Sequence, residues 1–156
     1  MLTVKFLIVI IVTIVGSACG LTSLVSNSQQ IQPGRDRSVL LPAEKAKDLI
    51  KQCSRKSPGF TATWDPTAVD IAKMEANFNK IVGLNSDLQD FYMQYVGLVV
   101  DGKKVIYINA FKDESSSQSN WKTIPTIVCD GGESFWGILF DVQKGEFFDL
   151  TFNGGP

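Results

Sequence analysis

The chain has 156 residues, of which 44% are hydrophobic and 20% are charged, with a formal net charge of −1. This length fits one domain, and the hydrophobic content excludes a chain that is disordered by composition. The balanced charge argues against nucleic-acid binding, and the absence of histidine excludes His-based triads, His general bases and His-ligated zinc.

The N-terminal segment has the pattern of a bacterial export signal. Lys5 precedes an apolar run over residues 6–15, which has the length of a signal-peptide core and is too short to span a bilayer comfortably. Residues 17–19 (Ser-Ala-Cys) resemble the end of a lipobox, in which the cysteine becomes the acylated first residue. We therefore expect a signal peptide over residues 1–18 and a lipid anchor on Cys19 that attaches the protein to a membrane.

Two alternatives stay open for this segment. Gly16 stands where a lipobox usually carries a branched apolar residue, and Gly16 with Ala18 also suits a general signal peptidase. The product would then be secreted or periplasmic, without lipid. The second alternative is an uncleaved N-terminal membrane helix.

The number of cysteines supports the lipid anchor. The sequence contains Cys19, Cys53 and Cys129, and an exported protein with three cysteines has one thiol left over after pairing. If Cys19 carries lipid, Cys53 and Cys129 can form a disulfide in an oxidising compartment. The alternative is that Cys53 and Cys129 are buried free thiols.

The segment after the signal is predicted to be a tether. Residues 21–38 are rich in Ser, Gln and Asn and lack periodic apolar spacing. We therefore expect the lipid-anchor cysteine and a flexible tether over residues 19–38, followed by a single α+β domain over residues 39–156.

Two amphipathic helices are predicted at the start of this domain. Apolar residues recur at three- and four-residue spacing over residues 40–53, where Cys53 closes the apolar stripe. A loop follows over residues 54–63. Asp65 and Pro66 then predict the N-cap and first position of a second helix, which ends near Gly83.

Strands are predicted from residue 91 onward. Residues 91–100 and 103–111 are rich in aromatic and β-branched side chains, and the Asp-Gly pair between them predicts a hairpin turn. A polar loop follows. Further strands are expected over residues 121–130, where Pro125 indicates an edge strand or a bulge, and over residues 134–141 and 146–152.

The order of these elements predicts an α+β fold. We expect an antiparallel sheet of four to five strands in a meander, with the two N-terminal helices packed on one face in a cystatin-like arrangement.

Short strings in the second half of the chain resemble those of a family of uncharacterised bacterial exported proteins. They are QYVG at residues 94–97, GKK at 102–104, IYIN at 106–109, CDGG at 129–132, FWG at 135–137 and NG at 153–154. Over residues 50–155 the chain is similar to this family. The resemblance implies a small, exported, lipid-anchored α+β domain and implies no activity.

The densest group of candidate site residues follows Cys129. Asp130 and Glu133 offer two carboxylates, the two glycines between them let a ligand approach the backbone, and Trp136 offers a flat stacking surface. The structural alternative is a strand that ends in a disulfide, a glycine turn, and a tryptophan that anchors the core.

Aromatic residues near the predicted hairpin form a second candidate. Tyr92, Tyr95, Tyr107 and Trp121 could bind a peptide or a sugar, or could simply fill the face of the sheet. Tyr107 and Asn109 alternate with isoleucines, so this strand has one partly polar face, which is the better candidate for a binding surface.

The motifs that are absent favour a binding protein over an enzyme. The chain has no Gly-x-Ser-x-Gly elbow, no phosphate-binding glycine loop and no EF-hand spacing, so we expect no catalytic residue, metal or other cofactor. We expect a binding module of the cell envelope whose partner is an envelope protein or a glycan, and no nucleic-acid partner. The alternatives are a small carbohydrate-active or other hydrolase that uses Asp130 and Glu133, and an inhibitor of a lysozyme or a protease.

Overall fold

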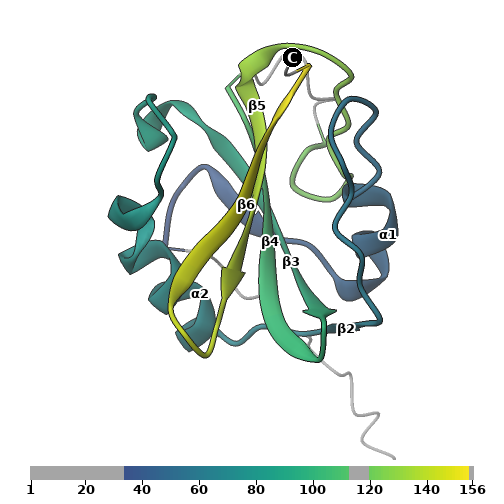
Figure 1. The fold of residues 1–156 in the computed structure, drawn as a ribbon, viewed down its shortest axis with the longest axis vertical. Helices are drawn as coiled ribbons and strands as arrows, with labels where there is room; N and C mark the ends of the chain where they lie inside the picture. Colours follow the sequence, from purple (N-terminus) through teal and green to yellow (C-terminus); the bar gives the residue numbers. More distant parts are fainter. Residues whose placement is uncertain (1–33, 113–119, 155–156) are drawn as a thin grey trace, which may run out of the picture.

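The computed structural model describes residues 34–112 and 120–154, which form a curved sheet flanked by short helices (Figure 1). This arrangement confirms the predicted α+β class. The strands are β1 (Ser38–Leu40), β2 (Ala62–Trp64), β3 (Tyr92–Val100), β4 (Lys103–Phe111), β5 (Gly132–Asp141) and β6 (Glu146–Asn153). The helices are α1 (Ala46–Leu49) and α2 (Ala68–Ala76), with 3₁₀ turns η1 (Ala43–Lys45), η2 (Phe78–Lys80) and η3 (Leu88–Asp90).

The four long strands form the predicted antiparallel meander, β3-β4-β5-β6. Asp101 and Gly102 make the turn between β3 and β4 with φ angles of 48° and 75°, as the Asp-Gly pair predicts. The sheet has six strands because β1 and β2 both pair with β3, β1 in parallel and β2 antiparallel. The pairing of β5 with β6 is irregular, and Asp149 in β6 has a φ of 55°.

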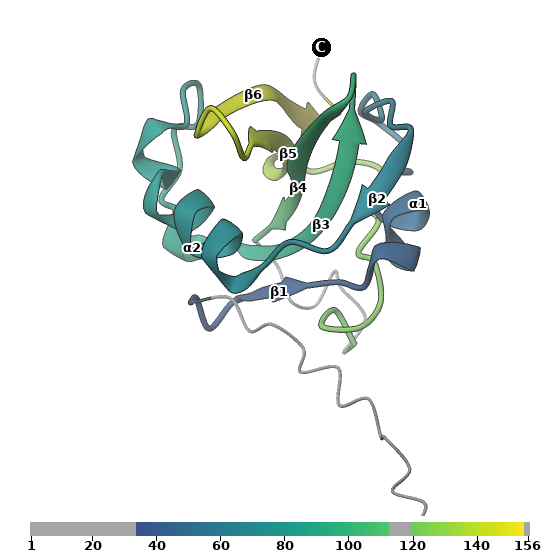
Figure 2. The same ribbon diagram turned by 90° about the horizontal axis from the view of Figure 1, so that it is seen from below.

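Both faces of the sheet are apolar, and a different helix covers each. Ala46 and Leu49 of α1 join a cluster that contains Val96 of β3, whereas Ile71 and Met74 of α2 join the cluster on the other face. Figure 2 shows α1 and α2 on opposite sides of the sheet. The prediction that the two helices pack on one face is therefore wrong. The reason is that β3 and β4 carry near-continuous apolar runs, as strands buried on both faces do.

The helices are shorter than the sequence predicts. Thr67, and not Asp65, is the N-cap of α2, and it forms a capping box with Asp70. Before α1, Leu41 N–H still donates to the Tyr95 carbonyl at 2.9 Å, so the chain is paired to the sheet where a helix is predicted. Pro42 then has extended backbone, with φ −57° and ψ 148°, which delays the helical turn.

The strand predicted over residues 121–130 is wrong, because this segment has no strand pairing. It crosses the face of the sheet that α1 covers, with Trp121 buried in that cluster. Its backbone groups bond to amide side chains, as described below, and so do not form a ladder with a neighbouring strand.

The predicted signal peptide, Cys19 and most of the predicted tether lie outside the described residues, as do residues 113–119 of the polar loop. Within residues 34–112 and 120–154, no helix is long and apolar enough to cross a membrane.

Candidate functional site

Side-chain amides hold the irregular segment over the sheet. Gln94 of β3 donates to the carbonyls of Trp121 and Ile124, and its own carbonyl oxygen accepts from Thr126 N–H at 2.8 Å. Asn109 of β4 donates to the Thr126 carbonyl at 3.0 Å and to the Gln94 carbonyl oxygen at 3.3 Å. The amides of Gln94 and Asn109 thus use their donors and acceptors inside the protein, which gives the segment a fixed path across this face.

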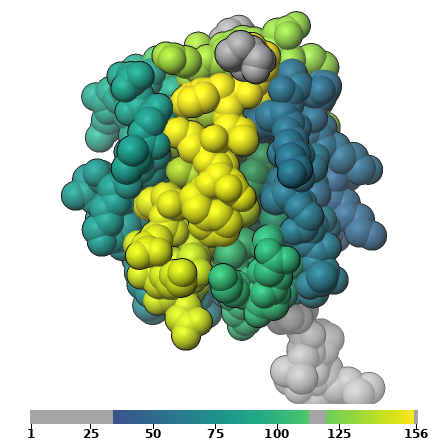
Figure 3. Space-filling model, viewed as in Figure 1, coloured from purple at the N-terminus to yellow at the C-terminus, as the bar shows by residue number. Residues whose placement is uncertain are grey.

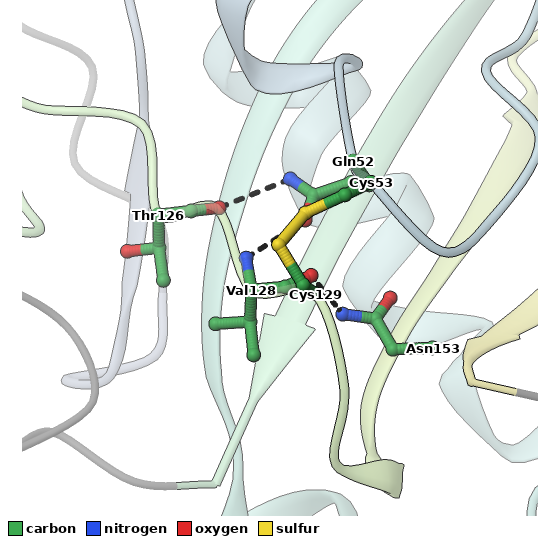
Figure 4. The surroundings of a disulfide bond; sticks show 6 residues. All are labelled: Gln52, Cys53, Thr126, Val128, Cys129 and Asn153. Carbon is green, nitrogen blue, oxygen red and sulfur yellow. Dashed lines mark hydrogen bonds between the residues drawn. A yellow bond between two sulfur atoms is a disulfide. The ribbon is translucent and has the colours of Figure 1, made fainter.

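A disulfide fixes the end of the same segment. Cys53 and Cys129 are bonded, with their Cα atoms 4.8 Å apart, which confirms the predicted pair. On either side of the bond, Val128 N–H donates to the Gln52 side chain at 3.3 Å, and the Asn153 amide donates to the Val128 carbonyl at 2.6 Å (Figure 4). The disulfide therefore joins the loop after α1 to the segment before β5, and the Asn153 hydrogen bond attaches that segment to the end of β6.

A row of polar and small residues crosses this face of the sheet. Gln94, Asn109, Gly137 and Thr151 are successive register partners on β3, β4, β5 and β6, and we call them the polar row. The Arg55 guanidinium lies above this row. Its Nη2 donates to Asn109 Oδ1, and its Cζ is 3.1 Å from the position of a Cβ built on Gly137.

Arg55 is a buried cation that has no anionic partner among the described residues. The residue is 8% exposed. Neither of the two ion pairs between described residues involves it. Its Nε and Nη1 are buried and have no hydrogen-bond partner among the described residues. Burial lowers the pKa of Arg55 from its ordinary value, and the neighbouring Tyr107 hydroxyl offsets part of that effect.

Tyr107 of β4 is the neighbour of Arg55 on this face. Its hydroxyl is 2.8 Å from the position of the Gly137 Cβ, on the side of the glycine that Arg55 also occupies. Burial raises the pKa of Tyr107 from its ordinary value, and the positive charge of Arg55 opposes this rise. At neutral pH the hydroxyl is therefore protonated and can both donate and accept a hydrogen bond.

A cavity of about 440 Å³ adjoins Tyr107 and the end of the polar row. It lies between the loop of residues 56–59 and β6, which stand on the same face of the molecule (Figure 3). Tyr107 and Leu139 belong to the sheet beneath it. The other lining residues are Val100 and Asp101 at the β3–β4 turn and residues 149–151 of β6. The lining therefore combines apolar side chains with charged and hydroxyl groups.

The predicted aromatic residues do not form one surface. Tyr95 is fully buried on the face that α2 covers, where its hydroxyl donates to Glu75 Oε1 at 3.1 Å. Tyr107 and Asn109 lie on the opposite face, as their alternation with isoleucines predicts. Trp121 belongs to the Tyr107 face and Trp136 to the Tyr95 face, and both are buried.

The two predicted carboxylates lie elsewhere. Asp130 and Glu133 are exposed at the start of β5, and neither lines the cavity. The described residues contain no group of three or more acidic or cysteine side chains that could hold a metal ion.

Sequence reasoning missed Arg55. It falls in a segment predicted to be a loop, and a lone loop arginine carries no periodic signal. Its place two residues after Cys53 is the one available indication, because the disulfide pins that part of the loop to the fold.

No protein-family model, no curated protein and no solved structure matches this chain. The resemblance to bacterial exported proteins therefore stays a prediction from the residues.

Proposed function

We propose that this protein is an exported, lipid-anchored protein of the bacterial cell envelope whose folded domain is a binding module and not an enzyme. The observation that carries the proposal is the disulfide between Cys53 and Cys129. Disulfides persist outside the cytosol, and this one uses two of the three cysteines. Cys19 is left over, directly after the small residues of the signal pattern, where a lipid would be attached.

The cavity supports a binding role. Its volume of about 440 Å³ lies in the range of small-molecule sites, and its lining mixes apolar groups with a few polar ones. The chain has no histidine to act as a base beside Ser57 or Thr151, the hydroxyl residues of the lining. The alternative hydrolase gains no support, because Asp130 and Glu133 do not line this cavity.

Mass spectrometry of the protein purified from its native membrane tests export and anchoring together. We expect a mature N-terminus at Cys19 that carries acyl chains, and a mass gain of two hydrogen atoms on reduction. A Cys19→Ala variant should lose the acyl chains and keep the disulfide. A full-length chain with its leader intact, or free thiols at Cys53 and Cys129, would contradict the proposal.

Site-specific crosslinking tests the binding role. A photoreactive residue at exposed Gly59, beside the cavity, should capture an envelope protein or a glycan in intact cells. The matched control is the same residue at Val82, which is 87% exposed and lies outside the cavity lining. Equal capture from both positions would speak against a partner at the cavity.

A further inference from the structure

We propose that the cavity between residues 56–59 and β6 binds an amphipathic monocarboxylate, a small molecule with one carboxylate group and an apolar body. The inference deepens the proposed binding role and rests on it. Three features carry it: a buried cation beside Tyr107 of the lining that has no ion pair among the described residues, two hydrogen-bond donors in the lining, and apolar lining residues accompanied by two exposed acidic ones.

The positive charge of buried Arg55 favours an anionic ligand in the cavity. A buried charge is costly unless it is paired, and Arg55 has neither an ion pair nor partners for Nε and Nη1 among the described residues. It lies above the polar row, whose last member, Thr151, lines the cavity. An anion bound in the cavity would supply the missing negative charge through a low-dielectric region, where electrostatic attraction is strong.

Two hydrogen-bond donors line the cavity. Tyr107 lies against Arg55 and lines the cavity, so its oxygen can accept from the guanidinium while its O–H donates to a bound carboxylate. Lys56 follows Arg55 in the chain and adds an exposed ammonium group to the lining. Arg55 thus acts on the ligand through Tyr107, as a positioning residue, and Lys56 contacts it directly.

The rest of the lining selects the body of the ligand. Val100 and Leu139 supply the apolar part of the lining. Asp101, at the tip of the β3–β4 hairpin, and Asp149 are both exposed lining residues, and they would repel a second carboxylate. A monocarboxylate with a hydrocarbon chain offers one charge to Lys56 and an apolar body to Val100 and Leu139, whereas a dicarboxylate adds a second charge that the two aspartates repel.

Binding of three matched compounds tests this assignment. The probes are octanoate, octanamide, which lacks the charge, and octanedioate, which adds a second carboxylate. The full exported chain with Cys19→Ala and an intact disulfide is titrated by calorimetry and by amide NMR. We expect octanoate to bind saturably, about tenfold tighter than either other probe, as one charge-assisted interaction implies. Amide shifts should move at Gly137 and Thr151 and stay fixed at Gly34, which lies outside the cavity lining.

Variants locate the binding site. Lys56→Gln and Tyr107→Phe should each weaken octanoate binding severalfold, and Arg55→Gln about tenfold. Lys51→Gln is the matched control, because Lys51 is exposed, pairs with Asp48 and does not line the cavity. If Arg55→Gln fails to fold, the other two variants still decide the question.

Three results would overturn the assignment: no octanoate binding at millimolar concentration, equal affinity for octanoate and octanamide, or unchanged affinity in Lys56→Gln and Tyr107→Phe. None of these results depends on acylation of Cys19. Failure of the ligand assignment and failure of the export proposal are therefore distinguishable.

Discussion

Arg55 and Tyr107 lie against the same glycine. A Cβ built on Gly137 would be 3.1 Å from Arg55 Cζ and 2.8 Å from the Tyr107 hydroxyl oxygen. The missing side chain at this one position in β5 is what lets a guanidinium and a phenol share the face of the sheet. The two groups then reinforce each other, because Arg55 favours the ionised form of Tyr107 and Tyr107 favours the charged form of Arg55.

Gly137→Ala should therefore destabilise the fold. The added methyl group overpacks a buried site, and we expect a loss of about 1–3 kcal/mol in the free energy of unfolding, measured by urea denaturation. Gly59→Ala is the control, because a Cβ there has no atom within 4 Å. Equal stability of the two variants would mean that Arg55 and Tyr107 do not fill the space above Gly137.

Removal of the disulfide should lower the free energy of unfolding more than Gly137→Ala does. Cys53 and Cys129 are 76 residues apart, and in the chain-entropy model a loop of that length is worth about 4.5 kcal/mol. We expect the Cys53→Ala/Cys129→Ala double variant to lose close to that amount in urea denaturation, and the reduced native protein to lose a similar amount. A reduced protein as stable as the oxidised one would show that the bond does not constrain the unfolded chain.

Asn109→Leu should loosen the irregular segment. The substitution keeps the number and branching of the side-chain heavy atoms but removes the partner of the Arg55 guanidinium and of the Thr126 carbonyl. Each buried group left unpaired costs about 1–3 kcal/mol of stability. Asn109→Leu should therefore lower the free energy of unfolding more than the removal of an exposed amide does. Hydrogen exchange should accelerate at Thr126 N–H. The control is Asn77→Ala, which removes an exposed hydrogen bond to the Lys73 carbonyl. Unchanged exchange at Thr126 would contradict the role of Asn109.

Tyr95 should make the protein sensitive to alkali. Burial and then the charge of Glu75 raise the pKa of Tyr95 well above its ordinary value of 10.0. Above pH 10 the folded protein therefore keeps a proton that the unfolded chain loses, so the free energy of unfolding should fall as pH rises from there. Tyr95→Phe should flatten this fall, as followed by urea denaturation between pH 9 and 11 (roughly one unit on either side of the ordinary tyrosine pKa). An identical slope in both proteins would contradict the assignment.

The long strands could be predicted from the sequence because their signals are local. Residues 91–111 combine β-branched and aromatic side chains with an Asp-Gly turn, and the structure forms β3 and β4 within one residue of the expected bounds. The segment of residues 121–130 has the same composition but no strand pairing. Which partner its backbone takes depends on Gln94 and Asn109, which are distant in the sequence, so composition alone could not settle it.

The candidate site was predictable only in part. The alternation around Tyr107 and Asn109 predicts a partly polar face, and the structure places both residues on one face. The cavity depends on residues 56–59 and on residues 149–151, which the fold brings together from opposite ends of the domain. No spacing rule links an arginine in a loop to a glycine in a distant strand, so contact between them is a property of the three-dimensional fold alone.

The irregular pairing of β6 affects whether two molecules of this protein can pair through the edge of the sheet. Of the described strands, only β5 pairs with β6, so its other edge is open. A straight open edge invites a strand from a second molecule and starts aggregation. The left-handed backbone at Asp149 kinks this edge, and exposed Asp149 and Glu146 place negative charge along it. This bent, negatively charged edge disfavours strand pairing between two molecules, and therefore opposes aggregation at high protein concentration.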